Sequence, residues 1–447
     1  MSFFYTSVII ASIGGFLFGY DTGIISGALL FIKQDFILSV WQSELLVAAA
    51  LFGALIAAIL CGILANKTGR RAKLLLSALL FTAGSIGCFL APSLIWLLFN
   101  RFIVGLAIGI TSYTTPLYIA EIAPSRYRGG LVAFNTIAVT RGIVTAYLVS
   151  YLLADLQAWR FMFGLGSVPS VMLLISIHYL PESPRWLLKI GDYKQAKAML
   201  IKLHGESLQA MTEYQLIESH IKQFNPPWQS LFQPMYLRLL ILGFILALIQ
   251  QCTGINAILY YAPWLFEKLN LDHHSLFSVT FVIGLINFLM TIAAVYTVDK
   301  IGRRPLLLYG LGIMIISLFL LGLVLTIFPA QCWLAIACIF MFVAAYAMSI
   351  GCLFWIIIAE LYPLNVRNMV MGFASGIHWA ANLMVSLVFL SALDSIGISL
   401  TFWCFACAGL AGWLYCWFYL PETARFSLED IERRTIVDRV EDQCLIY

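Results

Sequence analysis

Long apolar segments alternate with short polar ones along the whole chain. A helix needs about 20 mainly apolar residues to cross the hydrocarbon core of a bilayer, and twelve segments meet this requirement. The predicted spans are residues 8–32, 44–65, 73–91, 95–120, 129–153, 160–180, 237–266, 276–298, 305–328, 332–359, 368–393 and 399–420. The pattern therefore predicts an all-α membrane protein with twelve transmembrane helices.

One polar stretch is much longer than the others. Residues 181–236 show helical spacing without an apolar run, which predicts short cytoplasmic helices. The expected organisation has four parts: an N-terminal six-helix half at 1–180, a cytoplasmic helical linker at 181–236, a C-terminal six-helix half at 237–420 and a cytoplasmic tail at 421–447.

The short polar segments occur twice, in the same order. Three motifs return at offsets of 233 to 240 residues: Gly69-Arg70-Arg71 as Gly302-Arg303-Arg304, Ala120-Glu121-Ile122-Ala123-Pro124 as Ala359-Glu360-Leu361-Tyr362-Pro363, and Pro181-Glu182-Ser183 as Pro421-Glu422-Thr423. A duplicated bundle with parallel halves is a known architecture of secondary transporters, in which the substrate lies between the halves. The repeat makes transport the leading functional hypothesis.

Composition and charge agree with a membrane protein. Hydrophobic residues make up 62% of the chain and charged residues 11%, whereas soluble domains carry about 25% charged residues. With both termini in the cytoplasm, 21 of the 26 lysines and arginines fall on the cytoplasmic side, as the positive-inside rule requires. The net charge of +4 therefore reflects topology and indicates no nucleic-acid partner. We expect a multi-pass monomer in a lipid bilayer, and short outer loops without glycosylation sequons favour a bacterial inner membrane.

The sequence gives no support to an enzyme. The deep carboxylate of the first span has no paired carboxylate, metal-ligand cluster or nucleophile–base set beside it, so we expect no catalytic residue, cofactor or metal. The 10 cysteines lie mostly inside apolar runs without paired spacing. This arrangement is typical of packing residues rather than of a disulfide framework or a zinc site.

Asp21 is a carboxylate near the middle of the first span. Placing a charge there costs about 2.5–3.5 kcal/mol on insertion scales, so such residues usually face a cavity and have a partner. Arg101, near the outer side of the fourth span, is the obvious partner. The functional hypothesis is a proton-coupling site, and the alternative is a permanent ion pair that only fixes packing.

A set of amides and aromatic residues in the second half suits a neutral polyol. Each amide offers two donors and an acceptor to ring hydroxyls, and an aromatic ring can stack on an apolar sugar face. The alternatives are amides that only join helices and aromatic residues that only pack. The candidate substrate-binding residues of this half are Gln250, Gln251, Asn256, Tyr261, Asn287, Trp355, Trp379 and Asn382. His378, beside Trp379, is interpreted as polar lining rather than a proton relay.

The repeated cytoplasmic motifs predict a conformational role. Charge pairs between the two halves would stabilise the outward-open state and break when the inner side opens, although the arginines also anchor the topology. The predicted cytoplasmic gate consists of Arg71, Glu121, Arg128, Glu182, Arg304, Glu360, Arg367 and Glu422.

Taken together, these motifs resemble the sugar porter family of the major facilitator superfamily along nearly the full length. The resemblance rests on the ordered set Gly19-Tyr20-Asp21-Thr22-Gly23, Gly69-Arg70-Arg71, Arg101-x-x-x-Gly105-x-x-x-Gly109, Pro181-Glu182-Ser183-Pro184-Arg185-Trp186-Leu187, Gln250-Gln251-Cys252-Thr253-Gly254-Ile255-Asn256 and Asp299-Lys300-Ile301-Gly302-Arg303-Arg304. It implies a major facilitator fold of two six-helix halves, alternating access, and a monosaccharide or similar polyol as substrate.

Two residues of the fifth span depart from the family pattern. Thr136 stands where hexose carriers typically have glutamine, and the local sequence is more similar to that of proton-coupled myo-inositol carriers. Arg141 replaces an expected small residue; if it faces the cavity, it adds donors for ring hydroxyls. With Thr136 counted among the substrate-binding residues, the sequence favours a cyclitol over a hexose or pentose.

The sequence therefore predicts secondary active transport of a sugar or cyclitol, by proton symport. An uncoupled sugar uniporter of the same fold is the alternative, and it would apply if Asp21 and Arg101 were only structural. A non-transporting sugar sensor is a remote alternative, because sensors of this fold typically have a longer cytoplasmic tail.

Overall fold

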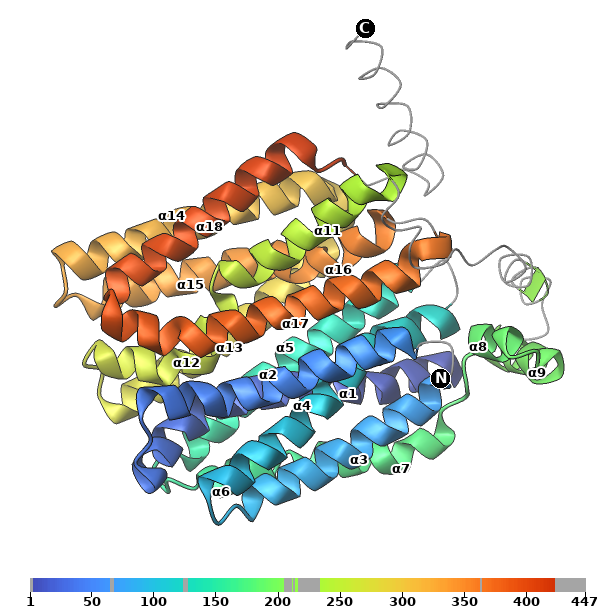
Figure 1. Ribbon diagram of the computed structural model, residues 1–447, viewed down its shortest axis with the longest axis horizontal. Coiled ribbons are helices and arrows are strands. Elements are labelled where there is room, and N and C mark those ends of the chain that lie inside the picture. Colours follow the sequence, from blue (N-terminus) through green and yellow to red (C-terminus); the bar gives the residue numbers. More distant parts are fainter. Residues whose placement is uncertain are drawn as a thin grey trace, which may run out of the picture.

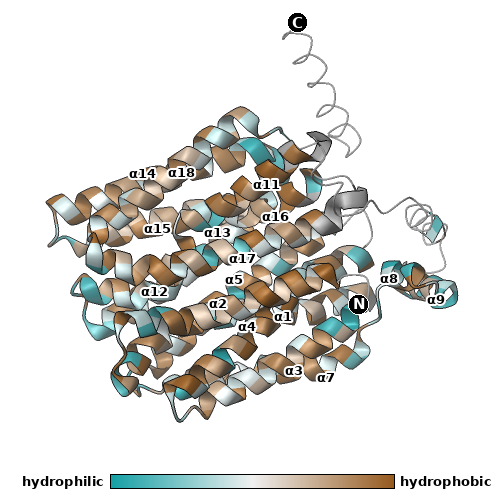
Figure 2. Cartoon of the chain, in the orientation of Figure 1, coloured by the Kyte–Doolittle hydropathy of each residue, from teal (hydrophilic) through white to brown (hydrophobic). Residues whose placement is uncertain are grey.

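The computed structural model describes residues 3–64, 68–123, 128–204, 211, 214–215, 234–361 and 364–422. Every secondary-structure element in these ranges is a helix, and twelve helical segments are long and apolar enough to cross a membrane. They run side by side in one bundle, with apolar surface along their length (Figures 1 and 2). The predicted all-α, twelve-span fold is confirmed.

The first six spans extend from Phe4 to Tyr179. Their helices are α1 (Phe3–Phe36), α2 (Val40–Ile63), α3 (Arg70–Phe89), α4 (Leu94–Ile122), α5 (Arg128–Leu153) and the broken sixth span α6 (Trp159–Gly164), α7 (Ser167–Ser176) and η2 (Ile177–Tyr179). Glycines allow close approach here: a Cβ on Gly19 of α1 would lie 1.8 Å from the Val139 carbonyl oxygen of α5. We call this set the N-terminal spans.

The last six spans extend from Leu240 to Tyr419 and are called the C-terminal spans. Their helices are α11 (Pro234–Cys252), α12 (Ile255–Lys268), α13 (His273–Ile301), α14 (Arg303–Ile327), α15 (Cys332–Met348), α16 (Ile350–Leu361), α17 (Leu364–Ser395) and α18 (Ile398–Tyr419). Two of these spans are interrupted, at Gly254 between α11 and α12 and at Ser349 between α15 and α16. Gly254 has φ = +83°, a left-handed conformation that glycine adopts without strain.

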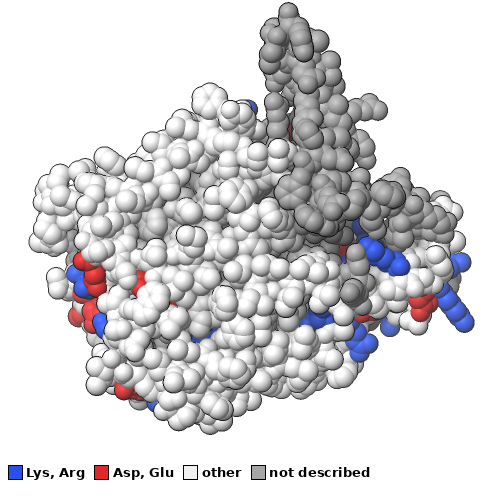
Figure 3. Space-filling model, in the orientation of Figure 1, with Lys and Arg blue, Asp and Glu red and all other residues white. Residues whose placement is uncertain are grey.

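Two short helices, α8 (Pro184–Lys189) and α9 (Tyr193–His204), follow the sixth span and lie beside one end of the bundle (Figure 1). They belong to the predicted linker, most of which after residue 204 lies outside the described residues. On the visible face, charged side chains gather mainly at the two ends of the bundle, and the broad band between them is almost uncharged (Figure 3). The end that carries α8 and α9 is the cytoplasmic end.

The two sets of spans pack against each other mainly through α2 with α17, α5 with α13 and α1 with α12. Near the cytoplasmic end, a Cβ on Gly62 of α2 would lie 3.5 Å from the Gly372 Cα of α17. At the outer end, the rings of Phe31 of α1 and Phe277 of α13 stack with centroids 5.7 Å apart. The substrate candidates of α11, α12 and α17 therefore lie close to the boundary between the two sets.

Candidate transport site

Asp21 and Arg101 form a buried ion pair inside the N-terminal spans. Arg101 of α4 donates from Nη1 to Asp21 Oδ1 of α1, and the two residues are 2% and 8% exposed. The Arg101 guanidinium also lies 5.5 Å from the centre of the Phe163 ring, within cation–π range. The structure thus brings together the two residues that the sequence predicts as partners.

The amides at the junction of α11 and α12 form one hydrogen-bonded group. Asn256 donates from Nδ2 to Gln251 Oε1 at 2.7 Å. Gln250 Oε1 lies 2.9 Å from His378 Nδ1 of α17, and Gln251 Nε2 lies 3.2 Å from the same nitrogen. The break at Gly254 turns the chain so that amides before and after it meet.

His378, which the sequence predicts as polar lining, lies against the amide group. It is 7% exposed, it contacts both glutamines, and its ring stacks on Phe354 with centroids 5.7 Å apart. The only signal in the sequence was its position next to Trp379. A single histidine inside an apolar span is by itself weak evidence, because its partners lie 127 and 128 residues away.

The two tryptophans adjoin this amide group. Trp355 of α16 lies 5.6 Å from the His378 ring, and Trp379 lies 5.4 Å from it, as ring centroids. Trp379 also reaches the N-terminal spans: its Nε1 donates to Ser112 Oγ of α4 at 3.3 Å, and its ring lies 5.5 Å from Phe18 of α1. Trp379 therefore bridges the two sets of spans next to the amides.

The remaining substrate candidates lie in different surroundings. Asn382 donates to the Tyr260 hydroxyl at 3.1 Å, one turn beyond His378 on α17. Tyr261 is fully buried behind the amides, where its hydroxyl donates to the Ser386 carbonyl and its ring stacks on Phe389. Asn287 of α13 is buried, and Thr136 of α5 is half-buried; no contact joins either to the amide group among the described residues.

Arg141 has an exposed side chain on α5. It lies on the same helical face as Phe134, Leu148 and Leu152, at steps of seven and eleven residues, and these three are 41%, 39% and 63% exposed. The opposite side of α5 packs on α1 and α13. This row of exposed residues continues to the outer end of α5. Because the two sets of spans are in contact there, the row lies on the outer surface of the bundle and not between the two sets. Arg141 does not face the cavity.

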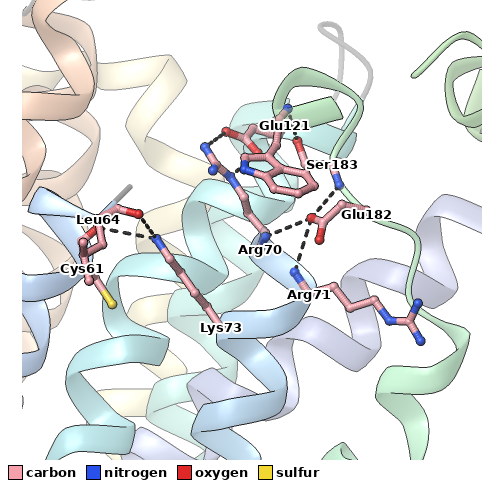
Figure 4. A network of polar contacts seen from close by, with 9 residues as sticks. Cys61, Leu64, Arg70, Arg71, Lys73, Glu121, Glu182 and Ser183 are labelled. Atoms are coloured by element: carbon pink, nitrogen blue, oxygen red, sulfur yellow. Dashed lines mark hydrogen bonds and ion pairs between the residues drawn. The ribbon is translucent and has the colours of Figure 1, made fainter. Parts of the chain in front are cut away.

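The cytoplasmic motif of the N-terminal spans forms a network around Arg70 (Figure 4). Arg70 donates from Nε and Nη2 to the two oxygens of Glu121 at 2.9 and 2.8 Å. Glu182 Oε1 accepts from the backbone N–H groups of Arg70 and Arg71, at 2.9 and 3.3 Å, and so caps the N-terminus of α3. The carboxylate occupies the space beside Gly69, where a Cβ would lie 2.1 Å from Glu182 Oε2.

The C-terminal spans repeat this network. Arg303 donates to both oxygens of Glu360 at 3.2 and 3.0 Å, and Glu422 accepts from the backbone N–H groups of Arg303 and Arg304 at 3.0 and 3.1 Å. Gly302 has φ = +101°, and a Cβ there would lie 2.9 Å from Glu422 Oε2. The glycine of each Gly-Arg-Arg motif therefore makes room for a capping carboxylate.

The described gate residues make their contacts within each set of spans. Glu121 pairs with Arg70, and Glu360 pairs with Arg303, each within its own set of spans. Charge pairs between the two halves in the outward-open state stay a prediction. Arg71 instead donates to the carbonyls of Ile177 and His178, and Arg304 donates to that of Trp417. Consecutive arginines at a helix start point in different directions, about 100° apart. The side chains of Arg128 and Arg367 lie outside the described residues.

Glu44 is a residue that the sequence analysis missed. It is fully buried on α2, near the outer end, and both of its oxygens accept from Ser391 of α17: Oε1 from the backbone N–H and Oε2 from the hydroxyl, each at 2.7 Å. This contact joins the two sets of spans. A carboxylate at the first residue of a predicted span is easily interpreted as interfacial, and only the position of α17 shows otherwise.

Comparisons with known proteins agree with this geometry. The family described as "Sugar (and other) transporter" matches residues 7–434. The chain is 37% identical to the glucose transporter GlcP of Staphylococcus epidermidis, covering 96% of each chain. It is 36% identical to the galactose-proton symporter of Escherichia coli, covering 96% of this chain and 94% of that protein. Among solved structures, the proton:xylose symporter XylE of E. coli, bound to 6-bromo-6-deoxy-D-glucose, superposes with a TM-score of 0.85 at 31% identity, covering 96% of this chain and 98% of that chain.

The match over nearly the whole chain, the twelve spans and the duplicated cytoplasmic network all point to the same conclusion. The chain belongs to the sugar transporter family of the major facilitator superfamily, and it is a multi-pass protein of the bacterial inner membrane type with both termini cytoplasmic.

Proposed function

We propose that this protein is a proton-coupled symporter that takes up a monosaccharide by alternating access. The observation that carries the proposal is the buried Asp21–Arg101 pair. A charged pair placed deep in a span is costly, and intramembrane ionisable residues commonly mark proton relays. Sequence relatives named for galactose–proton symport and a structural neighbour named for proton:xylose symport support the same assignment.

In this proposal Asp21 carries the transported proton. An ionised Asp21 holds Arg101, whereas a protonated Asp21 is neutral and releases the guanidinium, which lets α1 and α4 change their contacts. α1 also carries Phe18, which packs on Trp379 of the C-terminal spans. The protonation state of Asp21 can therefore alter the boundary where the sugar is bound.

The sugar site is proposed at the amide group of α11, α12 and α17. Gln250, Gln251 and Asn256 provide donors and acceptors for ring hydroxyls, His378 extends this set, and Trp379 can stack on the apolar ring face. Further contributions are proposed for Trp355, Asn382, Tyr261, Asn287 and Thr136. The transport cycle in this proposal needs no catalytic residue, metal or cofactor.

A monosaccharide is favoured over the cyclitol that the fifth span suggested. The cyclitol hypothesis rested on Thr136 and Arg141, and Arg141 lies on the outer surface of the bundle. The three similar proteins are named for glucose, galactose and xylose. Competition between these sugars and myo-inositol for uptake tests this choice of substrate directly. If myo-inositol displaced all three sugars at a lower concentration than they displace one another, the substrate would be a cyclitol.

We also propose that residues 1–180 and 237–420 move against each other as the two halves of the transporter. Residues 181–236 then link them, and 421–447 form a cytoplasmic tail. Contacts that hold the cytoplasmic helix ends within each half, including those of Glu182 and Glu422, keep each half rigid during the movement.

The coupling role is tested by Asp21→Asn in proteoliposomes. Asparagine resembles the protonated acid but cannot gain or lose the proton. We expect accumulation driven by a proton gradient to be abolished, while counterflow of labelled D-galactose, D-glucose or D-xylose remains measurable. The unmodified protein serves as control for both assays.

Two outcomes would contradict the proposal. Gradient-driven accumulation by Asp21→Asn at the rate of the unmodified protein would remove Asp21 from the coupling mechanism. Sugar counterflow by the unmodified protein without any proton-driven accumulation would establish the uncoupled uniporter instead.

A further inference from the structure

A small cavity lies against Asp21 inside the N-terminal spans. Its volume is about 10 Å³, and its walls come from α1, α3, α4 and the broken sixth span, with Asp21, Ser85, Val104, Phe163 and Gly166 among the lining residues. The amides of α11 and α12 are not among them. The cavity therefore belongs to the interior of the N-terminal spans and is separate from the proposed sugar site.

The cavity has the size and polarity that a single water molecule needs. A buried water requires roughly 10–15 Å³ and two to four polar partners. Asp21 uses Oδ1 to accept from Arg101, which leaves Oδ2 as an acceptor, and the Ser85 hydroxyl is a second partner on the wall. Arg101 Nε is buried without a hydrogen-bond partner in the part of the chain that the structure describes, and it belongs to the guanidinium that faces Phe163 on the cavity wall.

The lining residues also show how deep the cavity lies in the bundle. Ser85 lies four residues before Phe89, the outer end of α3, and Phe163 lies four residues after Trp159, the outer end of α6. Val104 lies ten residues after the outer end of α4. Asp21 is near the middle of α1. The residues of α3, α4 and the sixth span that line the cavity therefore lie nearer the outer ends of their helices than the cytoplasmic ends.

We propose that this cavity binds a water molecule, held by the Asp21 carboxylate and the Ser85 hydroxyl, that delivers the proton to Asp21 from the outer side. The water gives one proton to the carboxylate and receives one from the hydrated outer side, so that Asp21 becomes neutral and the water is regenerated. The proton then enters through the N-terminal spans, apart from the sugar route. This inference rests on the proposed symport function.

Two substitutions test the water site from different directions. Ser85→Ala removes one hydrogen-bond partner of the water. Gly166→Ala places a Cβ 3.1 Å from the Phe163 carbonyl oxygen, 3.2 Å from Ser85 Oγ and 3.3 Å from the Tyr20 ring, and so adds an atom among the residues that line the cavity. Because positioned proton transfer typically contributes 10²–10⁴-fold to a rate, we expect each variant to slow proton-driven uptake of D-galactose or D-xylose by at least about tenfold, while counterflow of the same sugar stays within about twofold.

Each test variant has a matched control. Ser77→Ala removes another buried serine hydroxyl of α3, two turns away, which donates to the Leu74 carbonyl and does not line the cavity. Gly312→Ala adds a Cβ in a helix where the nearest atom would be 3.9 Å away. Thermal unfolding of all four variants shows whether the fold is retained, and the counterflow assay shows whether the sugar site is intact.

The outcomes separate this inference from the symport proposal. If the unmodified protein couples uptake to protons and both test variants match their controls, the water site is wrong and the symport function stands. If the unmodified protein shows no proton-driven uptake, the symport function itself fails and this inference fails with it. Loss of counterflow together with proton-driven uptake in Ser85→Ala, in a folded protein, would also overturn it, because the hydroxyl would then act on the sugar route.

Discussion

At the residue scale, the amides of the proposed sugar site are held in position by one another. Gln251 accepts from Asn256 and contacts His378, and His378 in turn contacts Gln250. Gln250 and Gln251 are 3% and 1% exposed, so their side chains have little freedom to reorient. A sugar that enters this group replaces bonds that already have the correct geometry, which reduces the entropic cost of binding.

Removing one member of this group should weaken sugar binding. Gln251→Ala leaves Asn256 Nδ2 without its acceptor and removes one of the two glutamine contacts of His378, and an unpaired buried polar group costs about 1–3 kcal/mol. We expect the Kd for D-xylose or D-galactose, measured by calorimetry, to rise by about 5- to 150-fold. His378→Phe, which keeps a ring to stack on Phe354, should have a similar effect. The exposed Gln195 of α9 provides the control Gln195→Ala; unchanged affinity in both test variants would place the sugar elsewhere.

At the element scale, the two repeated cytoplasmic motifs cap the N-terminus of a helix in the same way. The N-terminus of a helix leaves backbone N–H groups unpaired, and both α3 and α14 begin at a glycine that has no side chain to cap them. A carboxylate from a distant segment supplies the missing acceptor, Glu182 for α3 and Glu422 for α14. The negative charge is also favourable at the positive end of the helix.

This arrangement predicts that Gly69→Ala and Glu182→Ala disturb the same contact. Loss of the cap should lower the free energy of unfolding by about 1 kcal/mol. In Gly69→Ala the new Cβ displaces the carboxylate, so the effect should be at least as large. The double variant should therefore be less destabilised than the sum of the two single variants, measured by thermal unfolding in detergent.

Additive effects of the two substitutions would show that the glycine and the carboxylate act independently. Gly130→Ala is the control, because a Cβ at that position would have no atom within 4 Å.

At the scale of the whole molecule, the two sets of spans are in contact at their outer ends. Glu44 of α2 holds Ser391 of α17, and Phe31 of α1 stacks on Phe277 of α13. These contacts must break before the outer side can open, since each joins one set of spans to the other. Glu44 is fully buried, so its separation from Ser391 exposes a charged group to water.

Substitution of Glu44 should shift the protein towards the outward-open state. Glu44→Ala removes the acceptor of the Ser391 N–H and hydroxyl, and a loss of about 1.4 kcal/mol in the closed state changes the ratio of states about tenfold. We expect a cysteine introduced by Phe31→Cys to react faster with a membrane-impermeant maleimide from the outer side in the Glu44→Ala background. Glu44→Gln, which retains one acceptor oxygen, should give an intermediate rate. Equal labelling in all three backgrounds would rule out a role for Glu44 in closing the outer side.

Much of this protein is determined by local sequence. Apolar runs of about 20 residues fix the spans, because a bilayer accepts only segments that satisfy their own backbone hydrogen bonds. The placement of lysine and arginine fixes the orientation, and the duplicated motifs show that the chain has two similar halves. The partnership of Asp21 with Arg101 was also foreseeable, because an intramembrane charge requires an opposite one.

Tertiary structure decided which residues meet. The sequence could not choose between Arg70 and Arg71 as the partner of Glu121, because neighbouring residues on a helix differ by about 100° in direction and only the position of α4 selects one of them. The role of Glu44, the partners of His378 and the outer surface position of Arg141 were equally hidden, because each depends on a helix that is distant in the chain or on the packing of its own helix against others. Periodicity along a chain determines which segments cross the membrane, whereas the rotation and contacts of each segment are set by packing between helices.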